Sequence, residues 1–107
     1  MKRRTEVDEK TASLALQSLA RALGGLSKSE EVRAFLQDLC TPAELEAMAD
    51  RWRVVPLILK GVPYREIHEL TEVSVTTIGR VARTLETGTG GYAAALRRQQ
   101  SRASAAQ

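Results

Sequence analysis

The stretch from Ser74 to Arg83 combines hydroxyl and guanidinium groups at helical spacing. Its sequence, SVTTIGRVAR, places hydroxyls at Ser74, Thr76 and Thr77 and guanidinium groups at Arg80 and Arg83. The stretch contains no acidic residue and carries a local charge of +2. Hydroxyls at a helix start, together with the positive end of the helix dipole, can meet phosphate oxygens, and an arginine one turn later can reach a phosphate or a guanine. The pattern therefore favours binding of a polyanion.

Other kinds of chemistry find little support in the sequence. One histidine, His68, and one cysteine, Cys40, exclude a histidine cluster, an internal disulfide and a multi-cysteine metal site. The glycine-rich segment Glu86–Gly91 lacks the preceding strand and the following Lys-Ser/Thr of a phosphate loop. Trp52 and Phe35 are expected to be core or dimer-interface anchors. We expect no enzymatic activity, no metal and no cofactor.

Length and composition indicate one small globular domain. The 107 residues are 43% hydrophobic and 27% charged. A chain of this length buries only about 60 to 68% of its unfolded surface, so a partner subunit is expected to complete the core. No apolar run approaches the ~18 residues that cross a bilayer, and the charged segment 1–10 does not resemble a signal peptide. We therefore expect a cytoplasmic protein with no membrane partner.

The net charge of +3 is weak evidence for a nucleic-acid partner because of where it lies. Residues 93–107 carry three basic and no acidic residues, whereas the rest of the chain is nearly balanced. This last segment is small, polar and unpatterned, which is typical of a frayed end. We expect a flexible N-terminal arm at 1–9, a single helical domain at 10–96 and a flexible basic tail at 97–107.

Strand patterns are missing, and the sequence predicts an all-α fold of five to six helices. Gly24-Gly25 should stop the first helix, either Ser27 with Glu30 or Ser29 should cap the second, and Thr41-Pro42 should open the third. Pro56 predicts a kink inside the third helix. The expected helices run from about Lys10 to Leu23, from the cap at Ser27 or Ser29 to about Leu39, from Pro42 to Lys60, from Pro63 to Leu70 or Thr71, from Ser74 to about Glu86 and, unless it frays, from Tyr92 to Gln99.

The fourth and fifth helices, joined by about three residues, predict a helix-turn-helix at about 63–86. Two residues fit this motif poorly. His68 stands where close helix crossing usually favours a small residue, and Glu72 stands in a turn that usually prefers glycine, at a cost of about 1 kcal/mol. Five apolar residues are expected to face inward and close the core: Ile67, Leu70, Val73, Ile78 and Val81.

These phrases resemble a known family. VSVTTIGRVAR is similar to the bacterial helix-turn-helix signature, and the span Leu39–Leu85 resembles the Trp repressor superfamily, especially its YerC/YecD branch. The matching phrases are TPAELEAMADRWRVV, the break at Gly61, YREI and SVTTIGRV. The resemblance implies an intertwined all-helical homodimer whose paired heads read palindromic operator DNA. It implies operator-facing positions at Arg65, His68, Val75, Thr76, Thr77, Gly79 and Arg80.

The same resemblance implies an effector pocket for tryptophan or another amino acid as corepressor. The matching positions are Thr41, Arg51, Arg80 and Thr84. Val81 stands where the tryptophan-responsive members have glycine, and Asp38 replaces an apolar wall residue, so tryptophan itself is expected to fit poorly. Arg51 could instead form a surface ion pair with a neighbouring acid such as Asp50, and Arg80 could serve DNA alone.

The sequence thus leads to the hypothesis of a homodimeric transcriptional regulator, a repressor of unknown effector, that binds near-palindromic double-stranded DNA. Ser74 and Arg83 are added to its DNA-facing residues because they share the open side of the helix with Arg80. The alternative is a protein-interaction module that uses the same fold without DNA. An RNA-binding version is third, since Tyr64 alone among the aromatic residues lies near the proposed face.

Overall fold

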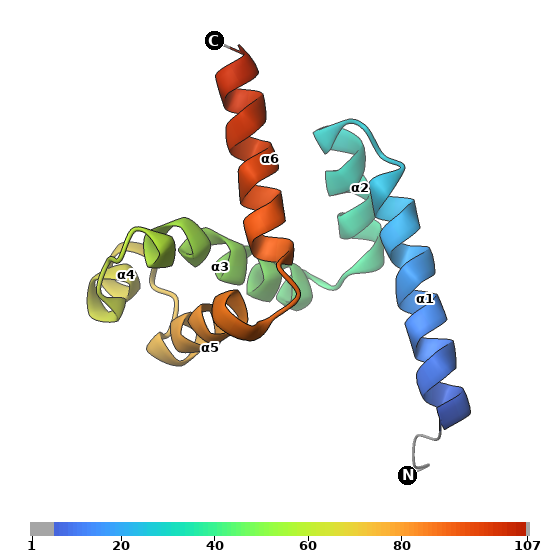
Figure 1. Ribbon diagram of the computed structural model, residues 1–107, viewed down its shortest axis with the longest axis horizontal. Helices are drawn as coiled ribbons and strands as arrows, with labels where there is room; N and C mark the ends of the chain where they lie inside the picture. Colours follow the sequence, from blue (N-terminus) through green and yellow to red (C-terminus); the bar gives the residue numbers. More distant parts are fainter. Residues whose placement is uncertain (1–5, 107) are drawn as a thin grey trace. The chain divides into compact units, whose positions relative to one another are not determined.

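The structure is a computed structural model that describes the backbone of residues 6–106 and the side chains of residues 8–102, and within them it is all-helical (Figure 1). None of the helices in this part of the chain is long and apolar enough to cross a membrane. The elements are α1 (Glu6–Gly24), α2 (Ser29–Leu39), α3 (Pro42–Leu59), α4 (Tyr64–Thr71), α5 (Val75–Thr87) and α6 (Gly91–Ala106).

The chain divides after Pro42 into two compact units. The expectation of a single domain at 10–96 stays a prediction. The first unit contains α1 and α2, and the second contains the rest of α3 and the helices that follow. All side chains that the structure describes as buried belong to the second unit. Of the expected N-terminal arm, residues 1–5 lie outside the described residues, and residues 6–9 belong to α1.

Helix α2 begins without the side-chain cap that the sequence predicted. Its N-cap is Lys28, in extended conformation, and no side-chain hydrogen bond caps the helix. The prediction of a cap at Ser27 or Ser29 was therefore wrong, because Ser29 already lies inside the helix and a lysine ammonium cannot accept a hydrogen bond. Glu30 and Glu31 in the first turn still complement the positive end of the helix dipole.

Helices α3 and α6 differ in length from their predictions. Helix α3 ends at Leu59, one residue early, and stays helical through Pro56. Helix α6 continues to Ala106, so residues 97–106 of the expected tail are helical in the structure, and residue 107 lies outside the described residues. The extension is consistent with the composition, since neither glycine nor proline follows Gly91 and alanine recurs throughout.

The core of the second unit gathers β-branched side chains from α3, α4, α5 and the turn between the last two. Trp52 of α3 and Tyr92 of α6 border it and stack on each other, with ring centroids 6.4 Å apart. Valine and isoleucine lose little rotamer freedom when they are packed, which suits a small core. The fully or nearly fully buried residues are Val54, Val55, Ile67, Val73, Ile78 and Val81.

Four of the five residues predicted to close the helix-turn-helix core are buried, and Leu70 is not. Its side chain is 63% exposed. Ile67 is the buried residue of α4, and Leu70 lies in the last turn of this eight-residue helix, which ends at Thr71. The prediction for Leu70 was therefore wrong.

The loop between α5 and α6 requires a glycine at Gly88 for steric reasons. A Cβ there would lie 2.6 Å from the carbonyl oxygen of Thr84 and 2.9 Å from its Cγ2, closer than real contacts allow. The N–H of Gly88 donates a 2.8 Å hydrogen bond to the same carbonyl, which fixes the approach.

We expect Gly88→Ala to lower the free energy of unfolding by about 1–3 kcal/mol, because the added methyl must displace backbone. Gly91→Ala is the matched control, since a Cβ at Gly91 meets no atom within 4 Å. Urea denaturation followed by circular dichroism measures both variants. Equal stability of the two variants would contradict the steric argument.

Candidate nucleic-acid interface

Helices α4 and α5 pack against each other and are joined by Glu72, Val73 and Ser74 (Figure 1). Glu72 has a φ of 64°, a left-handed backbone conformation that residues other than glycine rarely adopt. Its N–H donates a 2.7 Å hydrogen bond to the carbonyl of His68, which ends α4. The sequence predicted that Glu72 fits this turn poorly because the turn usually prefers glycine. The positive φ of Glu72 confirms that prediction.

Side chains of α4 satisfy both backbone polar groups of Val73. The N–H of Val73 donates to Oγ1 of Thr71 over 3.1 Å, and its carbonyl oxygen lies 2.7 Å from Nδ1 of His68. Thr71 in turn donates to the carbonyl of Ile67 over 2.7 Å. The role of Thr71 in this turn was not predicted from the sequence. A threonine two residues before a buried turn valine is a usable signal, because its hydroxyl can reach the following backbone.

Ser74 caps α5 as the sequence predicted. Its Oγ accepts a 3.1 Å hydrogen bond from the N–H of Thr77 and donates a 3.0 Å hydrogen bond to Thr77 Oγ1. The hydroxyl of Ser74 is thus engaged in the cap, whereas the hydroxyl hydrogen of Thr77 is available for an outside acceptor. The cap leaves other amides of the first turn directed away from the helix, where the dipole is positive.

The structure leaves the predicted outward side of α5 accessible. The exposed residues there are Ser74, Val75, Thr76, Arg80 and Arg83, while Thr77 and Gly79 are half-buried. Val75 is 49% exposed, which is high for an apolar side chain next to a closed core. On α4, Arg65 and His68 are also exposed. Each residue that was predicted to face DNA is thus reachable at least in part.

The hydroxyls at the two ends of α5 are used differently. Near the C-terminus, Thr84 and Thr87 donate 3.0 Å hydrogen bonds to the carbonyls of Arg80 and Arg83. These hydroxyl hydrogens are turned back onto their own helix, so neither is available to an outside acceptor. Among the threonines of α5, the hydroxyls that can serve an outside acceptor therefore lie in its first half.

The acidic residues of this region lie outside the first half of α5. Glu66 and Glu69 are exposed on α4, Glu72 is exposed in the turn, and Glu86 follows near the end of α5. A phosphate chain would be attracted along α5 and repelled along the acidic part of α4. The charge distribution therefore defines one narrow positive strip and not a broad basic face.

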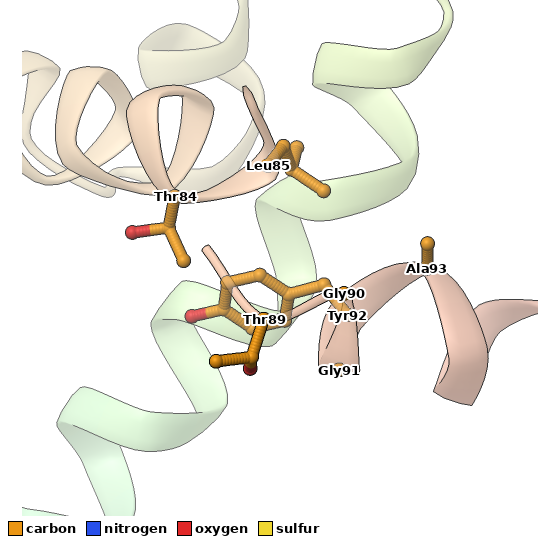
Figure 2. A pocket seen from close by; sticks show the side chains of 7 residues that line it. All are labelled: Thr84, Leu85, Thr89, Gly90, Gly91, Tyr92 and Ala93. Carbon is orange, nitrogen blue, oxygen red and sulfur yellow. The ribbon is translucent and has the colours of Figure 1, made fainter. Parts of the chain in front are cut away.

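The predicted effector-pocket residues are only partly associated with a cavity. A cavity of about 290 Å³ lies where α5 meets α6, with Thr84 and Leu85 from α5 and Tyr92 and Ala93 from α6 in its wall (Figure 2). Arg51 and Arg80 do not line this cavity. Val81 is 1% exposed and part of the core.

The four residues predicted for the effector pocket do not all belong to one unit of the chain. Thr41 belongs to the first unit, whereas Arg51, Arg80 and Thr84 belong to the second. Asp50, which the sequence offered as an ion-pair partner for Arg51, lies 3.8 Å from Arg53. Arg51 is half-buried.

Comparisons with known proteins place these features in a family. Residues 14–100 match the family described as Trp repressor protein. A Bacillus subtilis (strain 168) protein described as "Uncharacterized protein YerC" is 34% identical over 90 residues, which cover 84% of this chain and 86% of that protein. The crystal structure of a "putative Trp repressor" from Staphylococcus aureus superposes with a TM-score of 0.76 at 33% identity, covering 90% of this chain and 95% of that one. The chain belongs to the Trp repressor family, with its likeness on the YerC side.

Proposed function

We propose that the protein binds double-stranded DNA as a homodimer, with α5 of each subunit in a major groove, and that it regulates transcription as a repressor. The observation that carries the proposal is the exposed, acid-free first half of α5, whose inner side is held by the core. Membership of the Trp repressor family supports it, because proteins of that family bind DNA and are dimeric.

The dimensions and chemistry of α5 suit this role. A helix with its side chains is about 10–12 Å across, and the major groove of B-DNA is about 12 Å wide. Thr76 and Thr77 at the start of α5 can hydrogen-bond to base edges or phosphates, and Val75 can contact a thymine methyl group. Arg80, one turn later, is the residue best suited to a guanine, since its planar fork matches the O6 and N7 acceptors.

The remaining predicted residues take supporting roles in the proposal. Arg65 on α4 and Arg83 on α5 are exposed cations, and phosphates are their natural partners. Gly79 is half-buried, and a Cβ there would contact the Tyr64 ring at 3.9 Å, so its role in the proposal is to leave room beside α4.

The first unit of the chain supports the dimer. No side chain that the structure describes in α1 or α2 is buried, although both helices carry apolar residues. Leu14 and Leu16 of α1 are 57% and 67% exposed, and Leu39 at the end of α2 is 51% exposed. Apolar surface of this extent is costly in water, and a second copy of the chain that covers it would recover that free energy. A two-fold dimer would place its heads about 34 Å apart on a near-palindromic site.

The DNA contact is tested by Arg80→Ala after selection of bound fragments from random duplex DNA. We expect the variant to bind the selected site about tenfold or more weakly, because one guanidinium contact is worth about 1–3 kcal/mol. Fluorescence anisotropy measures the affinity. Arg98→Ala in α6 is the control with the same change in charge, and it should bind as the unmodified protein does.

Equal affinities of both variants would argue against α5 as the reading helix. A salt titration adds a second criterion, since DNA binding through phosphates makes log K fall steeply with log[salt]. A flat line, or a selection that enriches no sequence, would favour the protein-interaction alternative.

The dimer is tested by Leu16→Asp. Leu16 lies on the same side of α1 as the half-buried Leu19 and Leu23, so a carboxylate there would enter the expected interface. We expect sedimentation velocity to show a dimer of 11.7 kDa chains for the unmodified protein and a shift to monomer for the variant. Gln17→Asp adds the same charge on another side of α1 and should remain dimeric. A monomeric unmodified protein would refute the dimer outright.

A further inference from the structure

The turn between α4 and α5 holds a conformation that its own sequence disfavours. Glu72 at φ 64° costs about 1 kcal/mol relative to glycine, because its Cβ crowds the backbone in the left-handed region. Immediately after it, Val73 enters the core and is 4% exposed. Its backbone N–H and carbonyl would lose their water on burial, so each needs a partner within the protein.

His68 supplies the partner of the Val73 carbonyl. Nδ1 of its ring lies 2.7 Å from that oxygen, so this hydrogen bond is partly buried although His68 itself is exposed. A carbonyl oxygen only accepts hydrogen bonds, so Nδ1 must carry the hydrogen. In the neutral ring this leaves Nε2 as the nitrogen without a hydrogen. The contact persists in the charged ring, since the imidazolium carries a hydrogen on both nitrogens.

Thr71 supplies the partner of the Val73 N–H, as described above. Two side chains of α4 therefore hold Val73 by its two backbone groups, while its side chain is held by the core. Ser74, the cap of α5, is the next residue, so the direction in which α5 leaves the turn depends on how Val73 is held. The hydrogen bond to the Val73 carbonyl requires the imidazole of His68. Alanine or glycine, which close helix crossing usually favours at this position, could not form it.

We propose that His68 is a positioning residue of the DNA interface, which acts through the Val73 carbonyl to fix the start of α5. This inference rests on the proposed function and changes the role that the family resemblance implied for His68. In place of a contact to the operator, His68 makes an intramolecular hydrogen bond that determines where Thr76, Thr77 and Arg80 lie. The role needs Nδ1–H and does not need Nε2.

The tautomer of His68 is the first test, and it requires no DNA. The chain has one histidine, so the imidazole nitrogens of ¹⁵N-labelled protein give a single set of signals. At a pH where the ring is neutral, long-range ¹H–¹⁵N correlation should show hydrogen on Nδ1. A ring with hydrogen on Nε2 would overturn the assignment, because Nδ1 could then not donate to Val73.

A pair of amide substitutions tests the effect on binding. In asparagine, Nδ2 is bonded to Cγ as Nδ1 is in histidine, so His68→Asn can keep the donor to Val73 while lacking Nε2. In glutamine the amide is one bond further out, near the place of Nε2, so His68→Gln keeps a group for DNA and loses the donor to the turn. His68→Ala removes both.

We expect His68→Asn to bind the selected DNA site nearly as tightly as the unmodified protein, and His68→Gln and His68→Ala to bind about tenfold or more weakly, an effect on the scale of one lost partly buried hydrogen bond. The opposite order, with Gln retaining affinity and Asn losing it, would show that His68 contacts DNA directly. Equal affinities of all three variants, whether reduced or unchanged, would also overturn the proposal.

Failure of the proposed function gives a different result. If the unmodified protein binds no DNA, the tautomer still reports whether His68 holds the turn. Amide hydrogen exchange near Val73 and Ser74 should then be slow in the unmodified protein and in His68→Asn, and faster in His68→Gln. Slow exchange in both variants would show that the turn does not depend on His68.

Discussion

Burial of Val73 between two helices is the constraint on which the second unit depends. A valine in a three-residue turn reaches the core only if the backbone reverses sharply, and the reversal brings Ile67 of α4 and Ile78 of α5 against Val54 and Val55 of α3. Once these inner positions are occupied by apolar side chains, the opposite side of α5 is turned to solvent. The exposure of Thr76 and Arg80 is therefore a consequence of how the turn is packed.

The polar groups of the turn must be satisfied for this burial to be stable. The backbone of Val73 is paired with Thr71 and His68, the N–H of Glu72 with the carbonyl of His68, and the N–H of Thr77 with Oγ of Ser74. All of these partners lie within five residues of the groups that they satisfy. The turn is thus a locally determined structure, and it can keep its shape whatever DNA or protein approaches the outer side of α5.

The short sequence separation of these interactions also explains which features could be predicted from the sequence. The Ser74 cap, the strain at Glu72 and the burial of Ile67, Val73, Ile78 and Val81 follow from neighbours and helical period, and the structure confirms them. The exposure of Leu70 depends on which side of a short helix meets α3, which periodicity over eight residues does not fix. The demand for glycine at Gly88 arises from a close approach to Thr84 that spacing does not reveal.

The exposure of the outward residues of α5 could be predicted from the helical period. The hydrogen bond between His68 and Val73 could not, because a histidine on an exposed helix can point to either side.

The two units differ in how many apolar side chains they bury. The second unit buries six apolar residues, whereas the first buries none of the side chains that the structure describes, although α1 and α2 together span thirty residues. Helices of such length are marginal in water without packing, so the free energy that keeps the first unit folded must come from burial of its apolar side chains. In the homodimer proposed above, a second copy of the chain would supply this burial. In the dimer proposed above, both copies of α5 must leave their turns in the same direction to match a palindrome, so the local hydrogen bonds around Val73 would then contribute to the geometry of DNA binding.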